Sequence, residues 1–130
     1  MKVLMINGSP HPNGCTATAL NEVSETLHRH GIETEILYLG NKPIAGCIAC
    51  MKCFETGHCF RDDAVKDIQD RLAEFDAIIL GSPVYYSQPT GQITSFCQRL
   101  FFCKEGEMAG KLGASVVSCR RGGASATFEQ

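Results

Sequence analysis

Apolar runs and amphipathic stretches alternate along this chain. The runs at 2–7 and 77–82 are mostly apolar, as expected for parallel strands that are covered on both faces. Between the runs, apolar residues recur every three or four positions, which is typical of amphipathic helices. This alternation predicts an α/β fold with a parallel sheet. The expected elements are strands at 2–7, 33–38, 77–82 and 114–118, and helices that end at His30, begin at Ala64 and begin at Gln92.

Cap residues mark the ends of these helices. The first helix ends before Gly31, after a cationic segment at 28–30 that suits a helix C-terminus. Either Asp62 or Asp63 is placed to cap the second helix. We therefore interpret these aspartates as caps rather than as catalytic groups.

The loop at 8–16 joins the first strand to the first helix and contains glycine, proline and hydroxyl residues. A helix N-terminus presents free backbone N–H groups to an anion, and Ser9 and Thr16 add hydroxyl donors. The loop lacks the lysine motif of nucleoside triphosphatases and the three glycines of dinucleotide-binding turns. The loop thus predicts a site for a single monophosphate, with an ordinary capped turn as the alternative.

A second strand, loop and helix unit follows at 77–100. Its loop carries Tyr85 and Tyr86 between two prolines, which stiffen the backbone. Tyrosines on such a loop suit the flat faces of an aromatic ligand, although simple surface packing is the alternative. In an open parallel sheet, loops at the carboxyl ends of neighbouring strands can share one ligand. The two loops therefore predict a ligand with a phosphate and a ring system.

Three segments, at 8–16, 81–85 and 118–123, resemble the FMN-contacting loops of the flavodoxin-like NAD(P)H-dependent FMN reductase family. The resemblance covers essentially the whole chain and implies a doubly wound sheet of order 2-1-3-4-5. It also implies FMN as cofactor and NAD(P)H as co-substrate. The implied FMN-binding residues are Ser9, His11, Asn13, Cys15, Thr16 and Ala17 around the phosphate and ribityl chain, Pro83, Val84, Tyr85, Tyr86 and Ser87 along the isoalloxazine, and Arg121, Gly122 and Gly123 on its far edge.

Four cysteines occur within thirteen residues, with the spacing C-x2-C-x2-C-x5-C. Thiolates at this spacing can bind an iron–sulfur cluster or zinc, or remain free and redox-active. The motif is similar to that of the iron-sulfur flavoproteins, and the similarity implies a [4Fe-4S] cluster. Other FMN reductases that this chain resembles carry such a segment without metal, so all three alternatives stay open. The candidate ligands are Cys47, Cys50, Cys53 and Cys59.

The resemblance implies an oxidoreductase that transfers a hydride from NAD(P)H to FMN and then to a flavin, quinone or other small acceptor. The flavin carries this chemistry, so no catalytic side chain is expected. The alternatives are an iron-sulfur flavoprotein or a flavodoxin-type carrier that passes electrons to protein partners. A binding module that has lost its flavin is a further alternative.

Composition and charge bear on the expected partners and location of the protein. A net charge of −2 gives no electrostatic reason to expect nucleic acid or membrane partners. No apolar run is long enough to cross a bilayer, and the first residues lead directly into a strand rather than a signal sequence. We expect a cytoplasmic protein, in which clustered thiols indicate metal or redox chemistry. We also expect one domain over 1–130, with a cysteine-rich loop at 46–63.

Only four strand segments are visible, whereas the resembled fold has five. The segment 124–130 is expected to open a helix, and the fifth strand and last helix are absent from this chain. We interpret this as a shortened chain or as a fourth strand whose edge another chain covers. A homodimer or a higher homo-oligomer is therefore expected.

Overall fold

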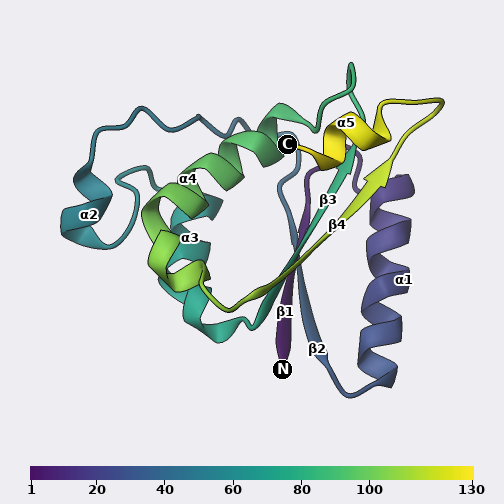
Figure 1. Cartoon of the computed structure of the whole chain (residues 1–130), viewed down its shortest axis with the longest axis horizontal. Coiled ribbons are helices and arrows are strands. Elements are labelled where there is room, and N and C mark those ends of the chain that lie inside the picture. The colour runs from purple at the N-terminus through teal and green to yellow at the C-terminus, as the bar shows by residue number, and fades with distance from the viewer.

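The computed structural model describes residues 1–130 and contains one four-stranded parallel sheet (Figure 1). The sheet has the order β2-β1-β3-β4, and each neighbouring pair is parallel. This order confirms the α/β, flavodoxin-like fold for the four strands that the chain provides. The strands are β1 (Lys2–Asn7), β2 (Glu33–Tyr38), β3 (Ala77–Pro83) and β4 (Leu112–Ser118).

Helices cover both faces of the sheet. In Figure 1, α1 lies on one side and α3 and α4 lie on the other, while α2 lies beyond α3 and α4. This arrangement is what parallel strands joined by helical crossovers require. The helices are α1 (Cys15–Arg29), α2 (Lys52–Thr56), α3 (Ala64–Arg71), α4 (Gly91–Met108) and α5 (Ala124–Phe128), and a 3-10 turn follows α3 at Leu72–Glu74.

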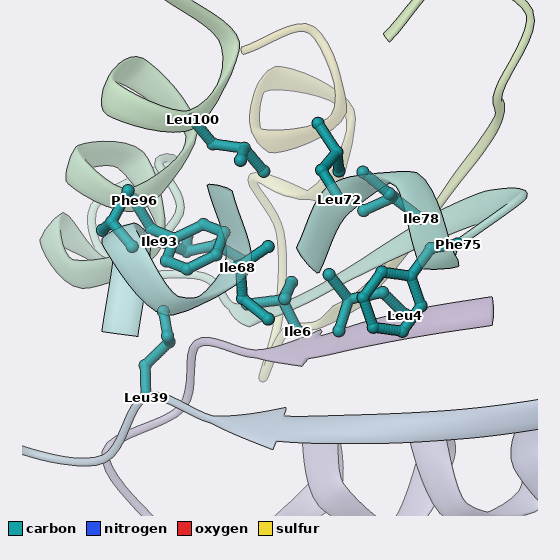
Figure 2. Close-up of a cluster of buried hydrophobic side chains, with 11 residues drawn as sticks. Leu4, Ile6, Leu39, Ile68, Leu72, Phe75, Ile78, Ile93, Phe96 and Leu100 are labelled. Carbon is teal, nitrogen blue, oxygen red and sulfur yellow. The ribbon is translucent and has the colours of Figure 1, made fainter. Parts of the chain in front are cut away.

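The two faces of the sheet have separate hydrophobic cores. Side chains alternate along β1, so Leu4 and Ile6 face α3 and α4 while Val3 and Met5 face α1. Figure 2 shows the larger core, which packs these two β1 side chains against aliphatic and phenylalanine side chains of the helices. The fully buried members of this core include Leu72, Phe96 and Leu100.

The predicted elements agree with the structure apart from their ends. The strands at 2–7 and 33–38 match residue for residue, whereas β4 begins two residues earlier than expected. The five-residue helix α2 was not predicted, and it is flanked by left-handed residues at Met51 and Gly57. The aspartate cap is Asp63, whose Oδ1 accepts a hydrogen bond from Val65 N at 3.1 Å.

Strand β4 forms one edge of the sheet. Strand β4 pairs with β3 on one side only, and Leu112 at its start is 62 % exposed. No helix in the structure combines the length and the apolar character needed to cross a membrane.

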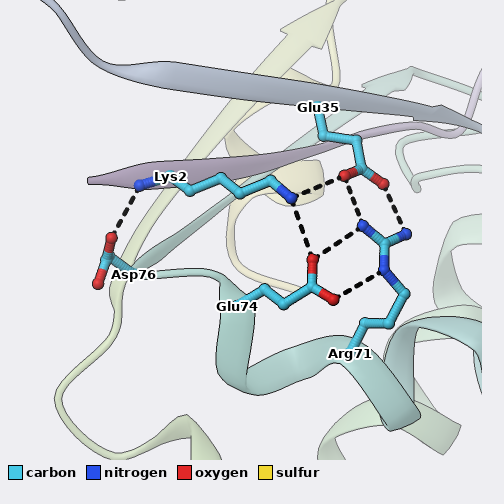
Figure 3. Close-up of polar contacts among 5 residues, drawn as sticks. All are labelled: Lys2, Glu35, Arg71, Glu74 and Asp76. Carbon is cyan, nitrogen blue, oxygen red and sulfur yellow. Dashed lines mark hydrogen bonds and ion pairs between the residues drawn. The ribbon is translucent and has the colours of Figure 1, made fainter.

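Charged residues form a network at the amino-terminal edge of the sheet (Figure 3). Arg71 donates two hydrogen bonds to Glu35, at 2.9 and 2.7 Å, and two more to Glu74. Lys2 Nζ lies 3.2 Å from Glu35 and 3.1 Å from Glu74. The hydrogen bonds from Arg71, followed by that from Lys2, lower the pKa of Glu74 to about 2. Every charge at this centre therefore has a protein partner.

Candidate functional site

Three loops follow β1, β3 and β4 and meet at the carboxyl edge of the sheet. The chain leaves β1 toward β2 on one side and enters β3 on the other side, so the strand order reverses at β1. Open parallel sheets bind ligands at such a switch point. The three loops are residues 8–14, 84–90 and 119–123.

Ser118, the last residue of β4, contacts the start of α1 and the second loop and leads directly into the third loop. Its hydroxyl is 2.9 Å from the Thr16 hydroxyl at the start of α1, and its carbonyl accepts a hydrogen bond from Val84 N at 2.9 Å. The third loop begins at the next residue. Thr90 Oγ1 adds a link between the first two loops by donating to Gly8 O at 2.7 Å. The loops therefore form one connected unit, although they are far apart in sequence.

The first loop leads into a helix N-terminus that no side chain caps. Asn7 Oδ1 accepts a hydrogen bond from Ser9 N, and Ser9 Oγ accepts one from His11 N. These bonds turn Ser9 inward, and both Ser9 and Thr16 are buried. Because the Ser9 hydroxyl accepts here, its own hydrogen remains available to a ligand. With no cap bond at Gly14 and no acidic residue in the first turn, the α1 N-terminus favours an anion.

Two glycines allow close approaches in this unit. A Cβ at Gly8 would lie 2.7 Å from Ile93 Cβ and 3.2 Å from Gly81 O. Gly123 has a φ of +90°, and a Cβ there would lie 2.9 Å from Ser87 Oγ. Side chains at either position would separate backbone segments that now touch. The third loop thus lies directly against the second.

The second loop presents its tyrosines on a tight turn. Tyr85 N donates to Gln88 O at 2.8 Å and Gln88 N donates to Tyr85 O at 3.1 Å. Tyr86 and Ser87 have positive φ angles of 53° and 62°, which are uncommon for residues other than glycine. The Tyr86 side chain is fully exposed and that of Tyr85 is nearly half exposed. Such strained, exposed positions cluster at binding sites.

The structure places all the predicted FMN-binding residues along this one edge. His11, Asn13 and Cys15 are exposed on the first loop, and Arg121 and Gly122 are exposed on the third. Their individual roles remain predictions. The residues concerned are Ser9, His11, Asn13, Cys15, Thr16, Ala17, Pro83, Val84, Tyr85, Tyr86, Ser87, Arg121, Gly122 and Gly123.

The cysteine motif forms a second candidate site, on and around α2. All four motif cysteines line one hollow, and all eight cysteines of the chain are unpaired. In this structure no three Cys, His, Asp or Glu side chains converge on a metal-binding position. Ligation by Cys47, Cys50, Cys53 and Cys59 therefore stays a prediction.

Three residues of α4 line the same hollow and were not predicted from the sequence, namely Arg99, Phe102 and Cys103. Arg99 is buried, and Cys103 lies one helical turn further along α4. Burial, together with the neighbouring Cys53 thiol, raises the pKa of Cys103 to about 11. The available signal was the spacing of four residues, which places both side chains on one face of a helix.

Comparison with known proteins identifies a matching family and several similar flavoproteins. The family model described as NADPH-dependent FMN reductase matches residues 1–130. An iron-sulfur flavoprotein of Methanocaldococcus jannaschii is 37% identical over 133 residues, covering 100% of this chain and 69% of its own length. An iron-sulfur flavoprotein of Archaeoglobus fulgidus is 33% identical over 118 residues, covering 90% of this chain and 54% of its own length.

Solved structures agree with the fold. RosB with a bound 8-demethyl-8-formylriboflavin-5'-phosphate intermediate has a TM-score of 0.77 at 15% identity, over 99% of this chain and 56% of that one. An FMN-dependent NADH-azoreductase from Bacillus anthracis, in complex with FMN, has a TM-score of 0.65 at 10% identity, over 92% and 69%. This chain thus spans between about half and two thirds of the length of several similar proteins. Because the family model matches every residue, the chain belongs to the NADPH-dependent FMN reductase family.

Proposed function

We propose that this chain binds FMN at the three loops and acts as an NAD(P)H-dependent oxidoreductase. The observation that carries the proposal is the position of Ser118, which contacts the start of α1 and the second loop and leads into the third loop. The RosB structure with its bound formylriboflavin phosphate and the azoreductase structure with FMN share this fold and support the same cofactor.

The phosphate is expected at the N-terminus of α1. Backbone N–H groups of the first helical turn and the Ser9 hydroxyl hydrogen supply donors there, and no acidic residue of that turn opposes an anion. The Thr16–Ser118 pair uses one of its two hydroxyl hydrogens internally and leaves the other for the ligand. A monophosphate of the FMN type fits this donor set.

The ring system is expected between the second and third loops. Tyr85 and Tyr86 offer aromatic faces, and the exposed Arg121 offers a positive charge at the opposite edge. Bound FMN would supply the hydride-accepting chemistry. The residues of this chain would hold the ring, leave one face open to NAD(P)H and place a cation where negative charge develops on reduction. No side chain needs to act as a nucleophile.

Two measurements test this proposal. Titration of the purified protein with FMN, followed by flavin absorbance and fluorescence, should give saturable binding of one FMN per chain. Oxidation of NADH and of NADPH should then be measured with a free flavin or a quinone as acceptor. Binding without turnover would favour a flavodoxin-type electron carrier, and the absence of flavin binding would contradict the proposal.

An iron-sulfur flavoprotein is the second candidate, because the four motif cysteines line one hollow. Relatives named iron-sulfur flavoproteins support it. Soft thiolate donors at this spacing suit iron and sulfide. In the present structure their sulfurs do not converge on one position, so ligation requires the cysteine segment to rearrange. Iron and sulfide analysis after anaerobic purification tests this candidate.

We also propose an oligomeric state and a cellular compartment for the protein. We expect a homodimer, since β4 has an unpaired edge that a second chain can cover. The unpaired thiols support a reducing, cytoplasmic environment. Light scattering of the eluted protein tests the oligomeric state, and a monomer would contradict it.

A further inference from the structure

Tyr38, the last residue of β2, contacts the first loop from outside the three loops. Its hydroxyl donates a hydrogen bond to Pro10 O at 2.8 Å. Tyr38 is the register partner of Asn7 at the end of β1, and Leu39 N donates to Asn7 O at 3.1 Å. The ring also lies close to the backbone at Gly40, where an added Cβ would be 3.4 Å from Tyr38 Cε1. The tyrosine hydroxyl is therefore held against the backbone of the loop, although the residue is partly exposed.

The bond from Tyr38 begins a chain of hydrogen bonds that ends at Ser9. Pro10 O and His11 N belong to the same peptide group. The oxygen of this peptide accepts from Tyr38, and its N–H donates to Ser9 Oγ at 3.1 Å. A peptide group that is bonded at both ends is held in one orientation, so Tyr38 helps to fix the donor that orients the Ser9 hydroxyl. Hydrogen bonds in such a chain also polarise and strengthen one another.

The Ser9 hydroxyl lies beside the uncapped N-terminus of α1. Ser9 is buried, and a Cβ added at Gly14, the residue before α1, would lie 3.9 Å from Ser9 Oγ. Because Ser9 Oγ accepts from His11 N, its own hydrogen points away from that donor. This hydrogen is therefore available where the free N–H groups of the first helical turn favour an anion.

We propose that Tyr38 is a positioning residue for FMN, acting through the peptide between Pro10 and His11 to direct the Ser9 hydroxyl toward the phosphate. This inference rests on the proposed function, and it adds to the site a residue of β2. One neutral hydrogen bond corresponds to a change of about two- to tenfold in affinity. Because the chain of bonds ends at the phosphate end of the site, Tyr38 should affect binding of the phosphate and not of the ring.

Tyr38→Phe tests the proposal, because it retains the ring and removes only the hydroxyl. Titration followed by flavin fluorescence should show FMN binding about two- to tenfold more weakly than to the unmodified protein. Riboflavin, which has the same ring system without the phosphate, should bind equally to both proteins. Thr26→Val is the control, since the Thr26 hydroxyl accepts a bond of the same length, 2.8 Å, from Arg29 at the other end of α1. This control should bind FMN normally.

A double-mutant cycle separates positioning from a structural role. Ser9→Ala removes the acceptor of the His11 N–H, so adding Tyr38→Phe to Ser9→Ala should weaken FMN binding no further. If Tyr38→Phe caused the same fold-loss with and without the Ser9 hydroxyl, the tyrosine would not act through that hydroxyl, and the proposal would be overturned. Thermal unfolding of each flavin-free protein establishes that the variants are folded.

Titration of the unmodified protein decides whether the FMN site itself is correct. If the unmodified protein and Tyr38→Phe bind FMN equally tightly, the role of Tyr38 is wrong and the FMN site stands. Equal weakening of FMN and riboflavin binding in Tyr38→Phe would indicate a general loosening of the loops, and it would overturn the role of Tyr38 in the same way. If the unmodified protein binds no FMN, both the proposed function and the role of Tyr38 are wrong.

Discussion

The two edges of the sheet differ in how their polar groups are satisfied. At the amino-terminal edge, Lys2 and Arg71 neutralise Glu35 and Glu74 through several short contacts (Figure 3). At the carboxyl edge, the loops are joined by hydroxyl and backbone hydrogen bonds rather than by ion pairs. The uncapped N-terminus of α1 leaves backbone donors free there. The charges at the amino-terminal edge are therefore all paired, whereas the carboxyl edge retains free backbone N–H donors.

This difference separates groups that stabilise the fold from groups that are available to a ligand. Charges that satisfy one another contribute to stability and leave nothing for a ligand. Free donors gain their partner only when a ligand arrives. Substitutions at the carboxyl edge should therefore change ligand affinity more than stability, and those at the amino-terminal edge should do the reverse.

The largest effect is expected for Thr16→Val, which keeps the shape of the side chain and removes the hydroxyl. It loses the bond to Ser118 and a donor expected for the phosphate. Hydrogen bonds to charged groups contribute about 1.5–3 kcal/mol, so FMN affinity should fall about 10- to 100-fold. Isothermal titration with FMN measures this. Thr18→Val, on the exposed side of α1, is the matched control and should bind FMN normally.

The next effect is expected for Gly123→Ala. An L-residue at a φ of +90° is strained by about 1–2 kcal/mol, and the new Cβ would lie 2.9 Å from Ser87 Oγ. Thermal unfolding should occur at a lower temperature, and FMN should bind more weakly, because the second and third loops would separate. Gly106→Ala in α4 is the control, since it lies outside the three loops, nothing lies within 4 Å of its added Cβ and its φ is not positive. Equal behaviour of the two variants would show that this loop contact is unimportant.

A smaller effect is expected for Arg71→Gln at the amino-terminal edge. The variant removes the bidentate bond to Glu35 and both bonds to Glu74, so the urea midpoint of unfolding should fall modestly. FMN affinity should not change, because the network lies at the opposite edge from the loops. Arg29→Gln is the control, since Arg29 is exposed and bonds only to Thr26 of its own helix. A marked loss of FMN affinity in Arg71→Gln would contradict the separation of the two edges.

The smallest effect is the acid dependence of this network. The pKa of Glu74 is lowered to about 2, and that of Glu35 is also lowered, mainly by hydrogen bonds from Arg71. A carboxylate with a lowered folded-state pKa stabilises the fold above its unfolded pKa of about 4.3, and this contribution is lost as pH falls toward about 2. Urea midpoints from pH 6 to pH 3 should therefore fall less in Arg71→Gln than in the unmodified protein. Parallel curves would contradict the prediction.

Local pattern explains what the sequence could predict. The strand β1 and the loop after it are encoded by an apolar run and by glycine, proline and hydroxyl residues within a few positions. The parallel arrangement of the four strands was therefore predicted correctly. A cap at Asp62 or Asp63 was predicted, and the structure shows that it is Asp63. The loop residues could be grouped because neighbouring parallel strands end at the same edge.

The ion pairs of Arg71 and Arg99 were not predicted, because they join residues that are distant in the sequence. The bond of Arg71 to Glu35 spans 36 positions, and that of Arg99 to Asp63 also spans 36. No local pattern distinguishes a buried arginine from an exposed one on a helix of mixed composition. The helix α2 has only five residues, too few for a helical period to be visible.

The position of Ser118 has a consequence for dynamics. It ends the one strand of the carboxyl unit that has a free edge, and strands paired on one side only exchange their amide hydrogens most readily. Opening of β4 would release both Ser118 contacts and so disrupt the proposed FMN site before the core unfolds. By linkage, bound FMN should slow deuterium uptake selectively in 112–118. FMN would thereby protect one of the two edge strands of the sheet, and protein without flavin should be more open to proteolysis in β4.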